Sequence, residues 1–143
     1  MKGGVLVDTG PLVACFIRKD SFHAWSRAQL ARIAPPLLTC EAVLAEACFL
    51  VRHCPGGSET ILELLRREIV RVAFHIEDHA DAVRKLMARY ANVPMSLADA
   101  CLVRMAELKP DATLLTLDSD FRIYRRHGRH ALSLIMPGTV PQR

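Results

Sequence analysis

The sequence predicts a single α/β domain over residues 1–143, with a central parallel β-sheet flanked by helices on both faces. Short apolar runs, typical of buried strands, alternate with segments of helical hydrophobic spacing about 10–15 residues long, which is the pattern of a parallel sheet. The length of 143 residues suits one domain, and a hydrophobic content of 51% argues against disorder.

The first strand is expected at Val5–Val7 and ends at a carboxylate, Asp8. Gly10 allows the chain to turn, and Pro11 suits the first turn of a helix whose apolar face lies at 12–17. Asp8 is therefore expected at the carboxyl end of a buried strand, which is the edge where open α/β sheets bind ligands.

The remaining elements follow from apolar spacing and from capping residues. Their order is a helix from a Ser21 cap to about Ile33, a strand at 37–40, a helix at 41–53, a helix opening at Ser58, a strand at 70–74, a helix at 77–90, a Ser96-capped helix at 97–108, a strand at 112–116, a short helical piece, a basic loop at 122–130, a last strand at 131–135 and a polar tail.

Composition bounds the class of protein. No apolar run approaches the roughly 18–20 residues of a membrane span, and the first strand follows the start too closely for a signal peptide. The five cysteines show no metal-ligand spacing, so we expect reduced thiols in a cytoplasmic protein. The net charge of +4 and the pI of about 9.0 are compatible with a polyanionic partner but too mild to indicate one.

Glu46 is the only charged residue in the apolar stretch 42–51, on a helix that is expected to be buried nearly all round. A buried ionised carboxylate is costly unless it is paired, hydrogen-bonded or bound to a metal. Alternatively, Glu46 points out through a polar gap or pairs with Arg52.

Asp99 stands in a similar apolar stretch, but Ser96 and Asp99 also fit a capping box. Asp118 follows a buried strand and could instead cap the short helix after it, as could Asp120. Asp8 could likewise be a turn residue.

A different hypothesis is that four of these acids meet at one site and bind a cation: Asp8, Glu46, Asp99 and Asp118. Like charges cannot all stay ionised close together without a cation between them. Oxygen-only ligands suit Mg²⁺, or Mn²⁺, and such an ion can orient a phosphate and lower the pKa of bound water. The chemistry this predicts is hydrolysis of a phosphodiester bond.

The same residues resemble the PIN-domain family, especially the VapC-type toxin ribonucleases of prokaryotic toxin–antitoxin pairs. The motifs that carry the resemblance occur in the family's order along nearly the whole chain: Val7-Asp8-Thr9-Gly10-Pro11-Leu12, Leu44-Ala45-Glu46, Ser96-Leu97-Ala98-Asp99-Ala100 and Leu115-Thr116-Leu117-Asp118-Ser119-Asp120-Phe121.

The resemblance implies a PIN-like α/β fold and Mg²⁺-dependent cleavage of RNA. It implies that Asp8, Glu46, Asp99 and Asp118 are the catalytic, metal-binding acids, with Thr9, Thr116 and Asp120 in supporting positions; Asp120 competes with Asp118 for the fourth acid. Similar proteins are often homodimers that bind a small antitoxin.

The basic stretch 122–130 follows the last acids. Beside the pocket, Arg122, Arg125 and Arg126 are expected to hold RNA phosphates, and Tyr124 could stack on a base. The alternative is a solvated, charged loop.

Two other functions compete with a ribonuclease. An aspartyl-phosphate-type phosphohydrolase also has an Asp after its first strand, but it usually needs a second Asp where this chain has Gly10. The second competing function is that of a PIN-like protein that processes or binds RNA and has no antitoxin.

Overall fold

The computed structural model describes residues 3–138. In chain order its elements are β1 (Val5–Val7), α1 (Thr9–Phe16), α2 (His23–Arg32), β2 (Leu37–Thr39), α3 (Glu41–Leu50), α4 (Gly57–Arg66), β3 (Val70–Val72), the 3₁₀ helix η1 (Ile76–His79), α5 (Ala80–Arg89), α6 (Leu97–Leu108), β4 (Thr113–Leu115), the 3₁₀ helix η2 (Ser119–Arg122), β5 (Arg125–Arg126), β6 (His130–Ala131) and β7 (Leu134–Ile135).

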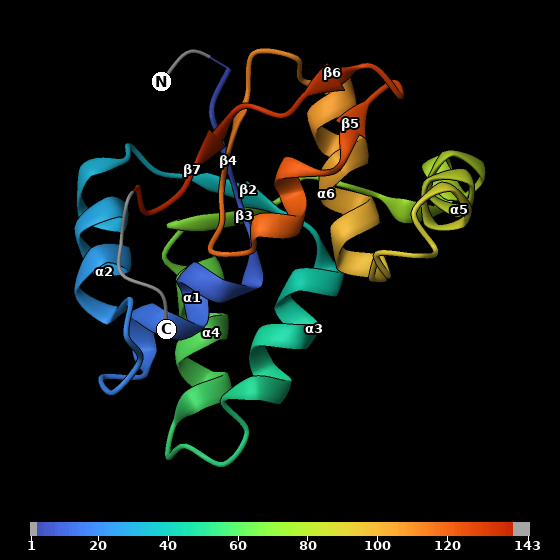
Figure 1. Ribbon diagram of the computed structural model, residues 1–143. Helices are drawn as coiled ribbons and strands as arrows, with labels where there is room; N and C mark the ends of the chain where they lie inside the picture. The colour runs from blue at the N-terminus through green and yellow to red at the C-terminus, as the bar shows by residue number, and fades with distance from the viewer. Residues whose placement is uncertain (1–2, 139–143) are drawn as a thin grey trace.

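Within these residues the main sheet has five strands in the order β3-β2-β1-β4-β7, and every neighbouring pair is parallel. The central strand β1 pairs through Leu6 with Leu38 on one side and with Leu114 on the other. Because β1 and β4 are parallel neighbours, their carboxyl ends lie at the same edge, and the segments that follow them start side by side (Figure 1).

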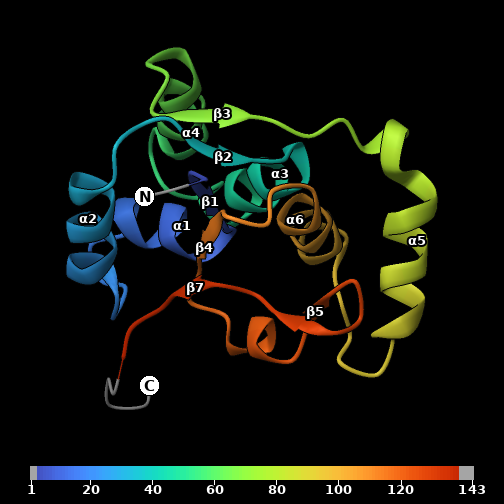
Figure 2. The same cartoon turned by 90° about the horizontal axis from the view of Figure 1, so that it is seen from above.

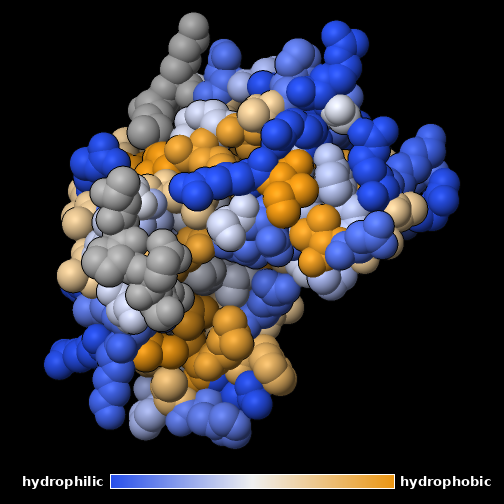
Figure 3. All heavy atoms as spheres, in the orientation of Figure 1, coloured by the Kyte–Doolittle hydropathy of each residue, from blue (hydrophilic) through white to orange (hydrophobic). Residues whose placement is uncertain are grey.

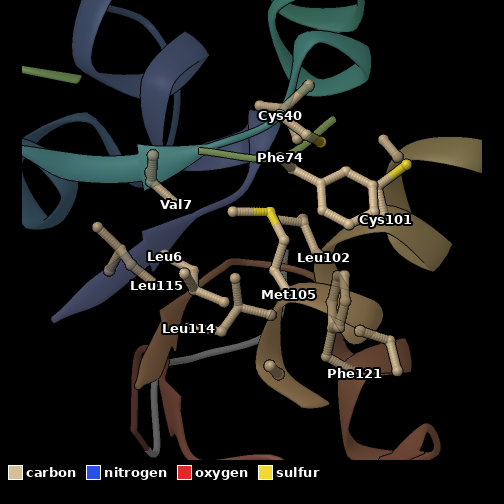
Figure 4. Close-up of a cluster of buried hydrophobic side chains, with 14 of the residues drawn as sticks. Leu6, Val7, Cys40, Phe74, Cys101, Leu102, Met105, Leu114, Leu115 and Phe121 are labelled. Atoms are coloured by element: carbon tan, nitrogen blue, oxygen red, sulfur yellow. The ribbon is translucent and has the colours of Figure 1, made fainter. Parts of the chain in front are cut away.

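Helices cover both faces of this sheet, which confirms the predicted architecture. Figure 2 shows α1 and α2 on one side of the strands and α6 and α5 on the other. All three residues of β1 are buried, as a strand covered on both faces requires. Side chains of β1, β4 and α6 meet in the core, where Leu6, Leu102, Met105 and Leu114 are at most 1% exposed (Figure 4).

Helix α2 begins differently from the prediction. Ser21 does not cap it, because Phe22 occupies the N-cap position and makes no side-chain capping bond. The turn before the helix is instead held by Asp20, whose Oδ1 accepts a hydrogen bond from the Phe22 N–H at 2.8 Å. The aspartate side chain therefore organises this turn locally.

The end of the chain also departs from the predicted loop and single strand. Residues 125–131 form an antiparallel β5–β6 hairpin, which pairs Arg125 with Ala131, and only Leu134–Ile135 joins the main sheet, beside β4. Residues 139–143 of the predicted polar tail lie outside the described residues.

The cysteines are free thiols, as expected. Among residues 3–138, no helix has the length and apolar character needed to cross a membrane.

Candidate functional site

Asp8 is held at the edge of the sheet by two hydrogen-bond donors. It directly follows β1 and is the N-cap of α1, where its Oδ1 accepts the Thr9 N–H at 2.7 Å. Its Oδ2 accepts the Thr116 hydroxyl, also at 2.7 Å, from the end of the neighbouring strand β4. Asp8 can therefore cap the turn into α1 and also belong to the candidate site.

Burial is the main influence on the pKa of Asp8. Its side chain is only 6% exposed, and this desolvation raises its pKa to about 7. The hydrogen bonds from Thr116 and Thr9 act in the opposite direction, whereas the negative charges of Asp99 and Asp118 raise the pKa further. A nearby cation would relieve both the burial cost and the repulsion.

Thr116 joins two of the acids. Its buried hydroxyl donates to Asp8 and accepts the backbone N–H of Asp118 at 3.0 Å. Asp118 is the N-cap of η2, the alternative role considered for it, and accepts the Asp120 N–H at 2.9 Å. The pKa of Asp120 is raised by desolvation and by the charge of Asp118.

Glu46 reaches the same region from α3. Its Oε1 accepts the Thr9 hydroxyl at 2.8 Å, which connects α3 with the start of α1. The expectation of a helix buried nearly all round was wrong: Glu46 is exposed, and only one side of α3 faces the core. Phe49 and Leu50, which suggested burial, are 60% and 54% exposed.

The alternative pairing of Glu46 with Arg52 is not found within the described part of the chain. The Arg52 guanidinium instead lies 3.7 Å from the centroid of the Phe49 ring and donates to the Phe49 carbonyl at 2.7 Å. Glu46 therefore faces the pocket without a basic partner from its own helix.

Asp99 combines the capping role with a place in the pocket. The Ser96 hydroxyl accepts the Asp99 N–H at 3.0 Å, and Asp99 Oδ2 accepts the Ser96 N–H at 3.4 Å, which completes the predicted capping box. Oδ2 also accepts the hydroxyl of Tyr124 at 2.9 Å. Burial raises the pKa of Asp99 despite these bonds.

A pocket of about 470 Å³ collects these acids at the carboxyl edge of the sheet. Every charged residue that lines it is acidic, and no basic side chain belongs to its described lining. The carboxylates come from the ends of β1 and β4, the turn before α2, helix α3 and the first turn of α6: Asp8, Asp20, Glu46, Asp99, Asp118 and Asp120. The sequence argument missed Asp20, because a carboxylate in a polar turn gives no local signal of a site.

The donor chemistry of this pocket fits a hard divalent cation, since all of the charged groups are carboxylates. In the described residues, no three His, Cys, Asp or Glu side chains already lie close enough together to hold one ion. Thr9 links two of these acids instead, since its N–H donates to Asp8 and its hydroxyl donates to Glu46. Ion binding would therefore require carboxylates to reorient within the pocket.

The basic segment after the acids is more ordered than a solvated loop. Arg125 uses its guanidinium locally and donates to the carbonyls of Arg122 and Tyr124 at 2.6 and 3.0 Å. Arg126 donates to the Ala131 carbonyl at 3.4 Å, whereas the side chain of Arg122 is exposed. Figure 3 shows hydrophilic side chains over the part of the molecule where β5 and β6 lie.

The idea that Tyr124 stacks on a base was wrong. Tyr124 is fully buried, with its ring packed against Tyr90 and Phe121 and its hydroxyl on Asp99. The sequence did not reveal this contact because the two partners are 25 residues apart and belong to different elements.

A larger pocket, of about 570 Å³, lies between α1, α2 and α4. Its charged lining is basic, from Arg18, Arg27 and Arg67, among apolar residues such as Leu12 and Ile61. Its chemistry is opposite to that of the acidic pocket, so it is not the candidate for a cation-dependent site.

These features define an α/β protein with an acidic pocket at the carboxyl edge of a parallel sheet. The family model described as "PIN domain" matches residues 5–126, and the chain belongs to the PIN-domain family.

Among solved structures, the chain is similar to the crystal structure of Mycobacterium tuberculosis VapC20, described as a sarcin–ricin loop cleaving toxin. The identity is 20%, the TM-score is 0.73, and the match covers 82% of this chain and 92% of that one. At this identity the likeness shows a shared fold. No curated protein sequence matches the chain.

Proposed function

We propose that the protein is a Mg²⁺-dependent endoribonuclease that hydrolyses RNA phosphodiester bonds, with Mn²⁺ as a possible substitute. The observation that carries this proposal is the pocket in which six carboxylates and no basic residue meet within the described lining. Membership in the PIN-domain family and the fold shared with an RNA-cleaving toxin support the same activity.

In this proposal Asp8, Glu46, Asp99 and Asp118 hold the cation. When bound, Mg²⁺ would lower the pKa of a coordinated water and neutralise charge that develops on the phosphate. In the metal-free site Thr116 holds Asp8 and the backbone N–H of Asp118, and Thr9 holds Glu46; these bonds would rearrange as the carboxylates turn toward the ion. Asp120, next to Asp118, adds negative charge at the rim.

Arg122 and Arg126 are proposed to bind RNA phosphates beside the pocket, because both belong to the segment that follows Asp118 and Asp120. Arg125 is proposed to act mainly by shaping this segment, since its guanidinium is engaged by backbone carbonyls. Phosphate contacts of this kind add affinity without selecting a sequence.

A protein partner is the second part of the proposal. Phe49 and Leu50 on α3 and Leu62 on α4 are each more than half exposed, which is the kind of surface that associates with protein. We propose that this surface serves a homodimer or a small antitoxin, in a cytoplasmic toxin–antitoxin pair. Co-expression with the product of an adjacent small gene, followed by co-purification and a growth assay, tests this part separately.

The competing phosphohydrolase is disfavoured by the structure around Asp8. The second Asp that this chemistry usually needs is absent, because Gly10 stands at that position within α1, where a Cβ would lie 3.3 Å from the side chain of Leu117. A second aspartate at this position would also require Leu117 to shift by a few tenths of an ångström.

The test compares Glu46→Gln with Glu41→Gln, which alters an exposed carboxylate on the same helix outside the acidic pocket. Structured RNA is incubated with Mg²⁺ or with EDTA. We expect Mg²⁺-dependent cleavage by the wild type and by Glu41→Gln, and a loss of about 100-fold in Glu46→Gln, because a metal ligand has lost its charge.

Equal cleavage by the two variants would contradict the site. Hydrolysis of phosphomonoesters without cleavage of RNA would favour the phosphohydrolase, and RNA binding without cleavage would favour a binding module.

A further inference from the structure

Three aromatic side chains pack together beside Asp99: Tyr90, Phe121 and Tyr124, called the aromatic wall below. Tyr124 lies at the centre: its ring packs edge-on against Tyr90, with centroids 5.0 Å apart, and against Phe121, at 5.2 Å. Tyr124 and Phe121 are fully buried. A buried ring held edge-on between two neighbours, at interplanar angles of 65° and 89°, has little freedom to turn, so packing limits the direction of its hydroxyl.

Within residues 3–138 the Tyr124 hydroxyl makes one hydrogen bond, to the carboxylate of Asp99. It donates to Oδ2 at 2.9 Å, whereas the capping-box bond from the Ser96 N–H to the same oxygen is longer, at 3.4 Å. Within the described residues no hydrogen bond to Oδ1 of Asp99 is found, although the Ser96 hydroxyl also lies close enough to lower the pKa of this carboxyl group. Oδ2 is therefore held by Tyr124 and by the backbone of Ser96, and Asp99 lines the acidic pocket.

The capping box alone does not explain this arrangement. Its bonds need only Ser96 and Asp99, and a phenylalanine at position 124 would fill the same space in the aromatic wall without burying a hydroxyl that needs a partner. The hydroxyl of Tyr124 thus acts on the carboxylate rather than on the packing.

Tyr90 offers an internal comparison. It belongs to the same wall and its hydroxyl is also engaged, but it accepts the backbone N–H of Arg125 at 3.0 Å and is not part of the acidic pocket. The hydroxyls of the two tyrosines therefore have different partners. Tyr90 binds the backbone at the start of the β5–β6 hairpin, and Tyr124 binds the carboxylate of Asp99.

We propose that Tyr124 is a positioning residue that acts through Asp99: its hydroxyl fixes Oδ2 so that Oδ1 is presented to a divalent cation in the acidic pocket. This inference rests on the proposed function, since it assigns a role within the same site. Groups that orient a metal ligand commonly matter almost as much as the ligand itself.

The experiment measures Mn²⁺ binding by calorimetry for the wild type, Tyr124→Phe, Tyr90→Phe and Asp99→Asn. Tyr124→Phe should weaken Mn²⁺ binding about 10-fold, the range typical for loss of a group that orients a ligand. Tyr90→Phe should bind Mn²⁺ like the wild type, although it removes a hydroxyl from the same aromatic wall. Urea unfolding in EDTA establishes that each of the three variants is folded.

A double variant sharpens the test. If Tyr124 acts through Asp99, Tyr124→Phe should cost nothing further in the Asp99→Asn background, because the oriented ligand is already lost. Additive losses would overturn the inference, as would wild-type Mn²⁺ affinity in Tyr124→Phe alone. If the wild type binds no Mn²⁺, the proposed function itself fails, and this outcome is distinct from a failure of Tyr124 alone.

Discussion

Replacing Asp8 by Asn should make the metal-free protein more stable at alkaline pH, although it damages the proposed site. The folded-state pKa of Asp8 is about 7, compared with an ordinary value of 3.8. Between these two pH values the folded protein keeps a proton that the unfolded chain releases. The stability of the wild type therefore falls as the pH rises from about 4 to about 7 and then levels off.

The size of the effect follows from the shift. About three pKa units correspond to at most about 4 kcal/mol of folding free energy above pH 7. Asn removes this cost, but it offers only one oxygen to the two donors, the Thr9 N–H and the Thr116 hydroxyl, which costs about 1 kcal/mol. The net gain for Asp8→Asn at pH 8 is about 2–3 kcal/mol, with little or no gain at pH 5.

Urea unfolding in EDTA at pH 5, 6, 7 and 8 measures this. The informative quantity is the difference between Asp8→Asn and the wild type at each pH, because contributions that the two proteins share cancel in it. The difference should grow in favour of the variant from pH 5 to pH 8. A difference that stays constant with pH would refute the reasoning about the burial of Asp8.

Three further predictions concern other parts of the molecule. Asp99→Asn should abolish ribonuclease activity while metal-free melting stays level or rises, because it keeps an acceptor for Ser96 and relieves repulsion; an active but destabilised variant would leave Asp99 with the capping role alone. Replacing Arg122 and Arg126 by Gln should lower the slope of log affinity for RNA against log salt by about 2, and an unchanged slope would count against this segment as a phosphate contact. Gly128→Ala should lower the free energy of unfolding by about 1–2 kcal/mol in urea titrations, because Gly128 has φ +71° and an added Cβ would meet Arg89; wild-type stability would show that the turn adapts.

Local signals in the sequence were sufficient for much of the site. An apolar strand that stops at Asp8 and the spacing of Ser96 and Asp99 are features of neighbouring residues, and the structure contains both the strand end and the capping box. Asp118 as a helix cap followed from the same kind of reasoning. The parallel sheet was predictable because alternation of strands and helices leaves few other arrangements.

Contacts between distant segments could not be read in this way. The bond from Tyr124 to Asp99 depends on how the segment after β4 packs on α6, whereas the sequence placed Tyr124 in a basic loop, where it could stack on a base. The apolar residues of α3 suggested burial, yet Phe49 and Leu50 remain exposed, since hydropathy alone does not tell which apolar side chains of a helix face the core.

The most direct test of the central claim is to locate Mn²⁺ in crystals by anomalous scattering, at a concentration that supports cleavage of RNA. The account predicts an ion in the acidic pocket, with carboxylate oxygens of Asp8 and Asp99 and at least one of Glu46 and Asp118 as ligands. An empty pocket at that concentration, or an ion bound only elsewhere on the protein, would contradict it.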